Sequence, residues 1–109
     1  MSDSFSDREK GFEAKFQLDA QLAFKAEARR NRLLGEWLAD NFGLTGEDKA
    51  AYAKEVVAAD LDEPGIEDVM RKVMADIADK GVAIAENEVR AKIEELNAVA
   101  AIQIREENT

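Results

Sequence analysis

One short segment concentrates positive charge in an otherwise acidic chain. Residues 25–32 hold four basic side chains and one acidic side chain, whereas the whole chain holds 15 basic and 24 acidic side chains and carries a net charge of −9. Guanidinium groups bind phosphate and carboxylate oxygens through paired N–H donors. The segment therefore has two interpretations. Its arginines pair with acidic residues of neighbouring helices, or Arg29, Arg30 and Arg32 contact an anion such as the phosphates of a nucleotide.

A stripe of phenylalanines marks the start of the chain. Phe5, Phe12 and Phe16 are seven and four residues apart, which places them on one side of a helix. Burying three phenylalanines contributes roughly 5–9 kcal/mol, whereas ordering about 16 residues costs roughly 16–32 kcal/mol of backbone entropy. We therefore expect the segment to be mobile in isolation and to become helical in the cleft of a partner. The alternative is that the stripe packs onto the rest of the chain.

The residue types that are missing exclude most classes of enzyme. The chain contains neither histidine nor cysteine, so it has no Ser–His or Cys–His nucleophile pair, no thiolate zinc site and no Glu-x-x-His di-iron motif. Away from the two ends, hydroxyl side chains are limited to Thr45 and Tyr52. We therefore expect a protein that is not an enzyme and that requires no cofactor.

Charge and hydropathy also bear on partners and location. A net charge of −9 disfavours binding to nucleic acid, whose phosphates attract clustered lysine and arginine. No apolar run approaches the roughly 20 residues of a membrane-spanning helix, and residues 1–16 are too charged for a secretory signal. The sequence thus predicts a soluble, cytoplasmic protein without direct membrane insertion.

The elements that must position these residues are helices. Alanine accounts for 19 residues and there is a single proline, a composition typical of an all-α fold. Glycine or proline interrupts the apolar pattern at 41–43, 62–65 and 80–81. The four remaining segments have helical apolar spacing and cover about 6–41, 45–60, 66–77 and 86 onward. Short connections favour antiparallel neighbours and hence a small four-helix bundle, and the lack of a sustained heptad seam favours a monomer.

Two details of these helices can be predicted. A Thr-x-x-Asp pattern from Thr45 to Asp48 approximates a capping box at the start of the second helix. One side of the first helix is mostly apolar and has further leucines beside it. That side consists of Leu22, Ala26, Arg29, Leu33 and Trp37, and the flanking leucines are Leu34 and Leu38.

Several segments form a pattern along nearly the whole chain. They are FSDRE at 5–9, FEAKF at 12–16, FKAEARRN at 24–31, LLG at 33–35, Trp37, YAKEVV at 52–57, EPG at 63–65, DV at 68–69 and RKV at 71–73. In their order and spacing they resemble the ATPase-inhibitory zeta subunit of alphaproteobacterial F-type ATP synthases.

The resemblance implies a four-helix bundle over 19–109 that carries a mobile, partly helical inhibitory arm over 1–18. In that family the arm inserts at a catalytic interface of the synthase head, which is built from alpha, beta and gamma subunits. Rotation in the hydrolytic direction then stops, while ATP synthesis is largely spared. Carried over by position, the partner contacts are Phe5, Arg8, Glu9, Phe12, Lys15 and Phe16.

The resemblance also implies a location and a ligand. An inhibitor of the synthase is peripheral to the inner face of the plasma membrane, where it is held through the enzyme. Family members are associated with nucleotide binding, so ADP or ATP is a regulatory ligand to consider.

Three hypotheses of function follow from these observations. The leading one is a regulatory inhibitor of ATP hydrolysis that acts through its N-terminal helix. The alternative is a nucleotide-binding bundle that senses ADP or ATP through Arg29, Arg30 and Arg32. The third is a structural bundle whose N-terminal stripe is docked on its own surface.

Overall fold

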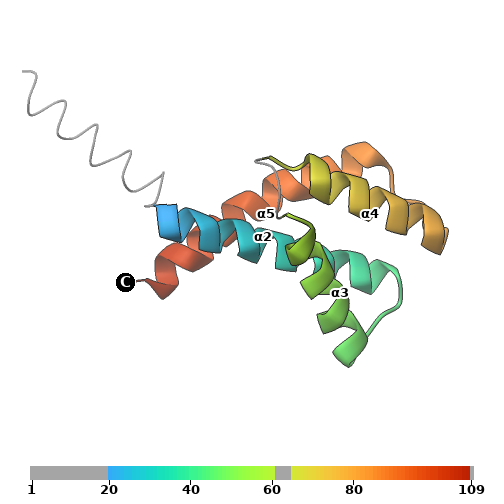
Figure 1. The fold of residues 1–109 in the computed structure, drawn as a ribbon, viewed down its shortest axis with the longest axis horizontal. Coiled ribbons are helices and arrows are strands. Elements are labelled where there is room, and N and C mark those ends of the chain that lie inside the picture. The colour runs from blue at the N-terminus through green and yellow to red at the C-terminus, as the bar shows by residue number, and fades with distance from the viewer. Residues whose placement is uncertain (1–19, 61–64, 109) are drawn as a thin grey trace, which may run out of the picture.

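The structure, a computed structural model, describes residues 20–60 and 65–108 of the 109-residue chain. Within these two ranges four α-helices follow one another and no strand occurs (Figure 1). The helices are α2 (Ala20–Asn41), α3 (Gly46–Ala59), α4 (Glu67–Lys80) and α5 (Glu86–Glu107). The predicted all-α fold is confirmed. The part of the first predicted helix that precedes Ala20 lies outside the described residues.

Glycines end two helices where the sequence predicts breaks. Gly43, after α2, and Gly81, after α4, have φ values of 79° and 67°. Glycine adopts this left-handed backbone at little cost because it has no Cβ. Beyond Gly81, the N–H of Val82 donates to the carbonyl of Ile77 at 3.2 Å, which satisfies a carbonyl in the last turn of α4. The chain therefore reverses sharply at both positions.

Helices α3 and α4 begin within one residue of their predicted starts at 45 and 66. The predicted side-chain cap of α3 is wrong. Thr45 is the N-cap residue, yet its hydroxyl makes no cap hydrogen bond. The backbone N–H of Asp48 donates instead to the Thr45 carbonyl at 3.1 Å. Gly46, between them, has a φ of 57°, and this left-handed backbone changes the direction in which the chain enters the helix.

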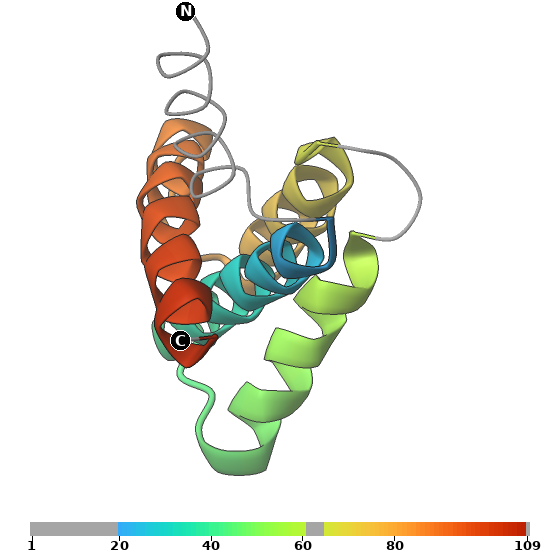
Figure 2. The ribbon, with the colours of Figure 1, turned by 90° about the vertical axis from the view of Figure 1, so that its left-hand side faces the viewer.

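Helix α2 lies between α3 and α5, as the two views show (Figures 1 and 2). Helix α5 runs antiparallel to α2 (Figure 1). All four helices contribute to one hydrophobic core, whose most buried members include Leu34, Leu38, Val56, Val69, Val73, Val89 and Ile93. The described residues therefore form one small helical bundle around a shared interior.

The buried side of α2 differs from the predicted one. Leu34 and Leu38 are fully buried, whereas Leu33 and Trp37 are only half-buried at the edge of the core. The centre of the buried side is displaced because neighbours pack against two flanks of α2. The ring of Trp37 is covered from outside by Lys92, whose Nζ lies 5.2 Å from the ring centroid.

Helices α2 and α3 approach each other closely at Gly35. A Cβ atom at this position would lie 2.6 Å from the backbone Cα of Ala53 and 3.2 Å from a methyl group of Val56. A backbone atom cannot move aside as a flexible side chain can, so the contact requires a residue without a side chain. Gly35 thus fixes the distance between the two helices in the second half of α2.

Candidate functional site

The predicted partner contacts precede the part of the chain that the structure describes. Phe5, Arg8, Glu9, Phe12, Lys15 and Phe16, and with them the predicted arm over 1–18, lie outside the described residues. The predicted boundary between arm and bundle therefore stays a prediction. Helix α2, which starts at Ala20, is the element that follows this segment directly.

The basic cluster lies on α2, and its three arginines have different surroundings. Arg29 faces the last turns of α5, where its guanidinium is 2.7 Å from the Glu107 carboxylate and donates to the side-chain oxygen of Gln103 at 2.8 Å. The hydrogen bond from Arg29 lowers the pKa of the Glu107 carboxyl, so this pair remains ionised at neutral pH. Arg29 therefore ties the first half of α2 to the end of α5.

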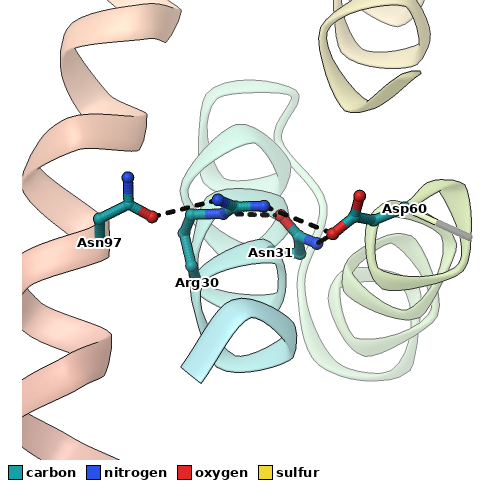
Figure 3. Close-up of polar contacts among 4 residues, drawn as sticks. All are labelled: Arg30, Asn31, Asp60 and Asn97. Atoms are coloured by element: carbon teal, nitrogen blue, oxygen red, sulfur yellow. Dashed lines mark hydrogen bonds and ion pairs between the residues drawn. The ribbon is translucent and has the colours of Figure 1, made fainter. Parts of the chain in front are cut away.

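Arg30 is the centre of a polar network that joins α2 to both neighbours (Figure 3). Its guanidinium donates to Asn31 Oδ1 at 3.0 Å and to Asn97 Oδ1 at 3.1 Å, and it lies 3.5 Å from Asp60 Oδ2. The amide of Asn31 donates to the same oxygen of Asp60 at 3.0 Å. The side chains of Arg30 and Asp60 are only 8% and 7% exposed. These contacts must open before Arg30 can face a ligand.

Arg32 is the arginine of the cluster with an exposed head. Its side chain is 52% exposed and lies 3.8 Å from the Glu36 carboxylate, one helical turn away. The structure thus directs the three guanidinium groups to α5, to the buried network and to solvent, rather than to one common surface. The interpretation in which arginines of this segment pair with acidic residues of neighbouring helices is confirmed for Arg29 and Arg30. The predicted nucleotide contact stays a prediction.

A groove runs along the exposed flank of α2. One hollow of about 480 Å³ lies between α2 and α3, and a second of about 470 Å³ lies between the start of α2 and the end of α5. Arg32 and Val57 line both hollows, so the two adjoin each other, and we call them together the groove. Alanines and Phe24 supply much of the apolar lining. This groove is the concave surface next to the basic cluster.

A second polar cluster joins α3 to α4. The Tyr52 hydroxyl donates to Asp76 at 2.8 Å, and the ammonium group of Lys72 contacts both Asp76 and Glu55 at 3.0 Å. Burial, strengthened by the hydrogen bond to the Asp76 carboxylate, raises the pKa of Tyr52 well above its usual value. Burial lowers the pKa of Lys72, but its two carboxylate partners outweigh that effect and raise it. The cluster is therefore a charged clamp between two helices.

This cluster gives a prediction for alkaline pH. Tyr52 is the single tyrosine of the chain, so the ultraviolet absorbance of phenolate measures its ionisation alone. Because its pKa is raised in the folded state, its contribution to stability is fully present below about pH 10 and is lost as the pH rises further. We expect the absorbance of the folded chain to rise only at a pH well above 10, whereas the free energy of unfolding should begin to fall near pH 10, where the tyrosine of the unfolded chain ionises.

The matched control for this titration is the Tyr52→Phe variant. It should show a smaller decline in stability above about pH 10, since only Lys72 of the two raised groups then remains. An absorbance midpoint close to the ordinary tyrosine pKa in the folded wild-type chain would contradict the prediction.

Sequence reasoning missed the partners of the arginines. Asp60 and Asn97 are 30 and 67 positions from Arg30, and no local pattern connects them. Within the ranges that the structure describes, no group of three histidine, cysteine, aspartate or glutamate side chains is placed to hold a metal ion. Likewise, none of the helices in those ranges combines the length and the apolar character of a membrane span.

Comparison with known proteins gives a consistent result. The model of a family described as ATPase inhibitor subunit zeta matches residues 1–103. A protein whose structure was solved by solution NMR is similar to this chain at 55% sequence identity and with a TM-score of 0.69; the alignment covers 77% of this chain and 95% of that one. No curated protein matches.

Proposed function

Since the chain belongs to the family of ATPase inhibitor zeta subunits, we propose that it blocks ATP hydrolysis by inserting its N-terminal helix into an F-type ATP synthase. The family assignment itself gives an ATPase inhibitor, a regulatory rather than catalytic protein whose partner is an ATP synthase. The proposal adds the mechanism. The N-terminal residues enter a catalytic interface of the head, and the receiving surface is formed by its alpha, beta and gamma subunits.

The observation that carries the proposal is the extent of the family match. The matched residues start at position 1 and therefore include the phenylalanine stripe as well as the helices. Among the described residues, α2 already buries Leu34, Leu38 and Ala39 against the other helices. An apolar helical stripe that precedes this core and belongs to the family pattern is suited to contact a partner.

The proposed contacts divide by chemistry. Phe5, Phe12 and Phe16 supply the apolar stripe, and burying all three in a cleft contributes roughly 5–9 kcal/mol. Arg8, Glu9 and Lys15 lie beside the stripe in the sequence and pair with charges of the receiving surface. Helix α2 continues directly from this segment, so the nucleation turn of a helix already exists at Ala20 and lowers the cost of extending it backward.

The location follows from the partner. An inhibitor that acts on the synthase head is held at the inner face of the plasma membrane through that enzyme and stays in the cytoplasm. The absence of a span among the described helices is compatible with such peripheral attachment.

The test is the effect of the purified chain on a synthase from a related alphaproteobacterium. ATP hydrolysis by the isolated head should fall to a low plateau as the chain is added, and the plateau should be reached near one chain per head. In sealed vesicles, ATP synthesis driven by a proton gradient should be reduced much less at the same concentration. Unchanged hydrolysis at saturating chain would refute the proposal.

A nucleotide-binding role is the second candidate, and the hollow at the start of α2 favours it. Arg29, Arg32 and Lys25 line this hollow together with the ring of Phe24, which gives cationic groups for phosphates beside an apolar surface for a base. In an NMR titration with ATP, we expect shifts centred on Arg29 and Arg32. Replacing Arg32 by Glu should weaken binding about tenfold or more.

The control for this titration is Arg71→Glu on α4, which reverses the charge of another exposed arginine that does not line the hollow. That variant should bind ATP as the wild type does. Shifts that concentrate elsewhere would refute the assigned site but not nucleotide binding, and a spectrum that ATP leaves unchanged would refute both.

A further inference from the structure

The groove on the flank of α2 has an unusual combination of lining residues. Phe24 is 70% exposed, and it is one of only two large hydrophobic side chains of the described residues that are so exposed; the other is Ile102. Ala28 and Val57 continue the apolar surface from Phe24 toward α3. An exposed phenylalanine at the end of an apolar groove is typical of a surface that a partner covers.

The charges along the groove oppose the charge of the whole protein. Lys25, Arg29, Arg32 and Lys54 line it, against the two carboxylates of Glu36 and Glu107. Lys54 has no ion-pair partner within residues 20–60 and 65–108. In a chain with a net charge of −9, this local excess of positive charge favours an acidic partner surface.

The position of the groove identifies the partner. Phe24 lies four residues after the start of α2, and the segment that carries the phenylalanine stripe ends directly before that helix. When those N-terminal residues occupy a cleft of the synthase head, the first turns of α2 and the groove beside them lie at the mouth of that cleft. A helix rises only about 1.5 Å per residue, so Phe24 cannot be far from the rim.

We infer that this groove is a second contact with the synthase head, and that it receives apolar side chains flanked by carboxylates from the rim of the cleft. The inference rests on the proposed function and extends it. The N-terminal residues block the enzyme, and the groove holds the bundle in place beside them. Phe24 supplies the apolar anchor, and Lys54 and Lys25 attract the acidic flanks.

The test compares two matched pairs of full-length variants. Phe24→Ser is paired with Ile102→Ser, which removes the other exposed large hydrophobic side chain. Ile102 is a suitable control because it does not line the groove, whereas its neighbour on α5, Ile104, does. Lys54→Glu is paired with Lys80→Glu at the far end of α4 (Figure 1). Binding of each labelled chain to the isolated head is measured by fluorescence anisotropy, inhibition is measured as ATP hydrolysis, and circular dichroism verifies folding.

We expect Phe24→Ser to raise the dissociation constant about tenfold or more, since it removes a buried aromatic anchor. Lys54→Glu should raise it about threefold to fivefold at low salt and less at high salt, because rim charges are screened. Ile102→Ser and Lys80→Glu should bind as the wild type does. At saturation all four variants should reach the same low plateau of hydrolysis, since the N-terminal residues are unchanged.

Each other outcome has a definite meaning. If the wild type binds and inhibits but Phe24→Ser and Ile102→Ser behave alike, the groove inference is overturned and the proposed function stands. If Phe24→Ser binds more weakly but no chain inhibits hydrolysis, the proposed function fails and the groove contact stands. Tighter binding by Phe24→Ser would show that the groove holds residues 1–19 of the same chain, which overturns the inference. A wild-type chain that does not bind the head refutes both.

Discussion

A chain that begins at Leu18 should lose inhibition of ATP hydrolysis while keeping its helical fold. The truncation removes the three phenylalanines of the stripe, whose burial contributes roughly 5–9 kcal/mol, so binding at the catalytic interface should weaken by more than about a thousandfold. The core should persist because the truncation keeps every buried residue that the structure describes in residues 20–60 and 65–108. Hydrolysis assays measure the first effect, and thermal unfolding followed by circular dichroism measures the second.

Two full-length variants sharpen this experiment. Replacing Phe12 and Phe16 by serine should reproduce most of the loss without shortening the chain. Gly11→Ala should have the opposite effect and strengthen inhibition about fivefold, because glycine inside a helix costs about 1 kcal/mol relative to alanine. Equal inhibition by the chain that begins at Leu18 and by the wild type would refute the inhibitory-arm mechanism.

The second large effect concerns stability. Asp60→Ala should lower the free energy of unfolding by about 3–5 kcal/mol, because it leaves the guanidinium of Arg30 buried without its counter-charge. The two side chains are 8% and 7% exposed, so water cannot replace the lost carboxylate. The amide of Asn31, which donates to the same carboxylate, loses its acceptor as well. Urea unfolding measures the change.

Two further variants test whether the network is the cause. Asp60→Asn keeps an oxygen acceptor for Asn31 and should cost clearly less than Asp60→Ala, since only the charge is lost. Asp79→Ala removes an exposed carboxylate of α4 and should change stability by no more than about 0.5 kcal/mol. An effect of Asp60→Ala as small as that of Asp79→Ala would show that the network contributes little.

The positions of the helices could be predicted because local chemistry determines them. Gly43 and Gly81 adopt left-handed backbone that other residues avoid, so the chain turns where these glycines occur. Between them, apolar side chains recur with helical spacing and point to one interior. The start of α3 was predictable for the same reason, but the side-chain cap at Thr45 was not, because it depends on the path of the chain through Gly46.

The surroundings of the arginines could not be predicted in the same way. Residues 25–32 show a dense positive charge, yet the sequence does not show which arginine is buried. The fate of Arg30 depends on Asp60 and Asn97, which come near it only because α3 and α5 pack on two flanks of α2. The packing of α3 and α5 on α2 also decides which side of α2 is buried. The apolar pattern predicted a side that contains Leu33 and Trp37, but Leu34 and Leu38 are the fully buried residues.

The support on both flanks of α2 has a mechanical consequence. From Arg29 to Gly35 the helix is braced by one ion pair and by hydrogen bonds to α5, and by the close approach of Gly35 to α3. A force transmitted along α2 from Ala20 is therefore shared with α3 and α5, so that α2 resists bending. Such stiffness would suit the proposed inhibitory mechanism, because a protein that stops rotation must resist bending under torque.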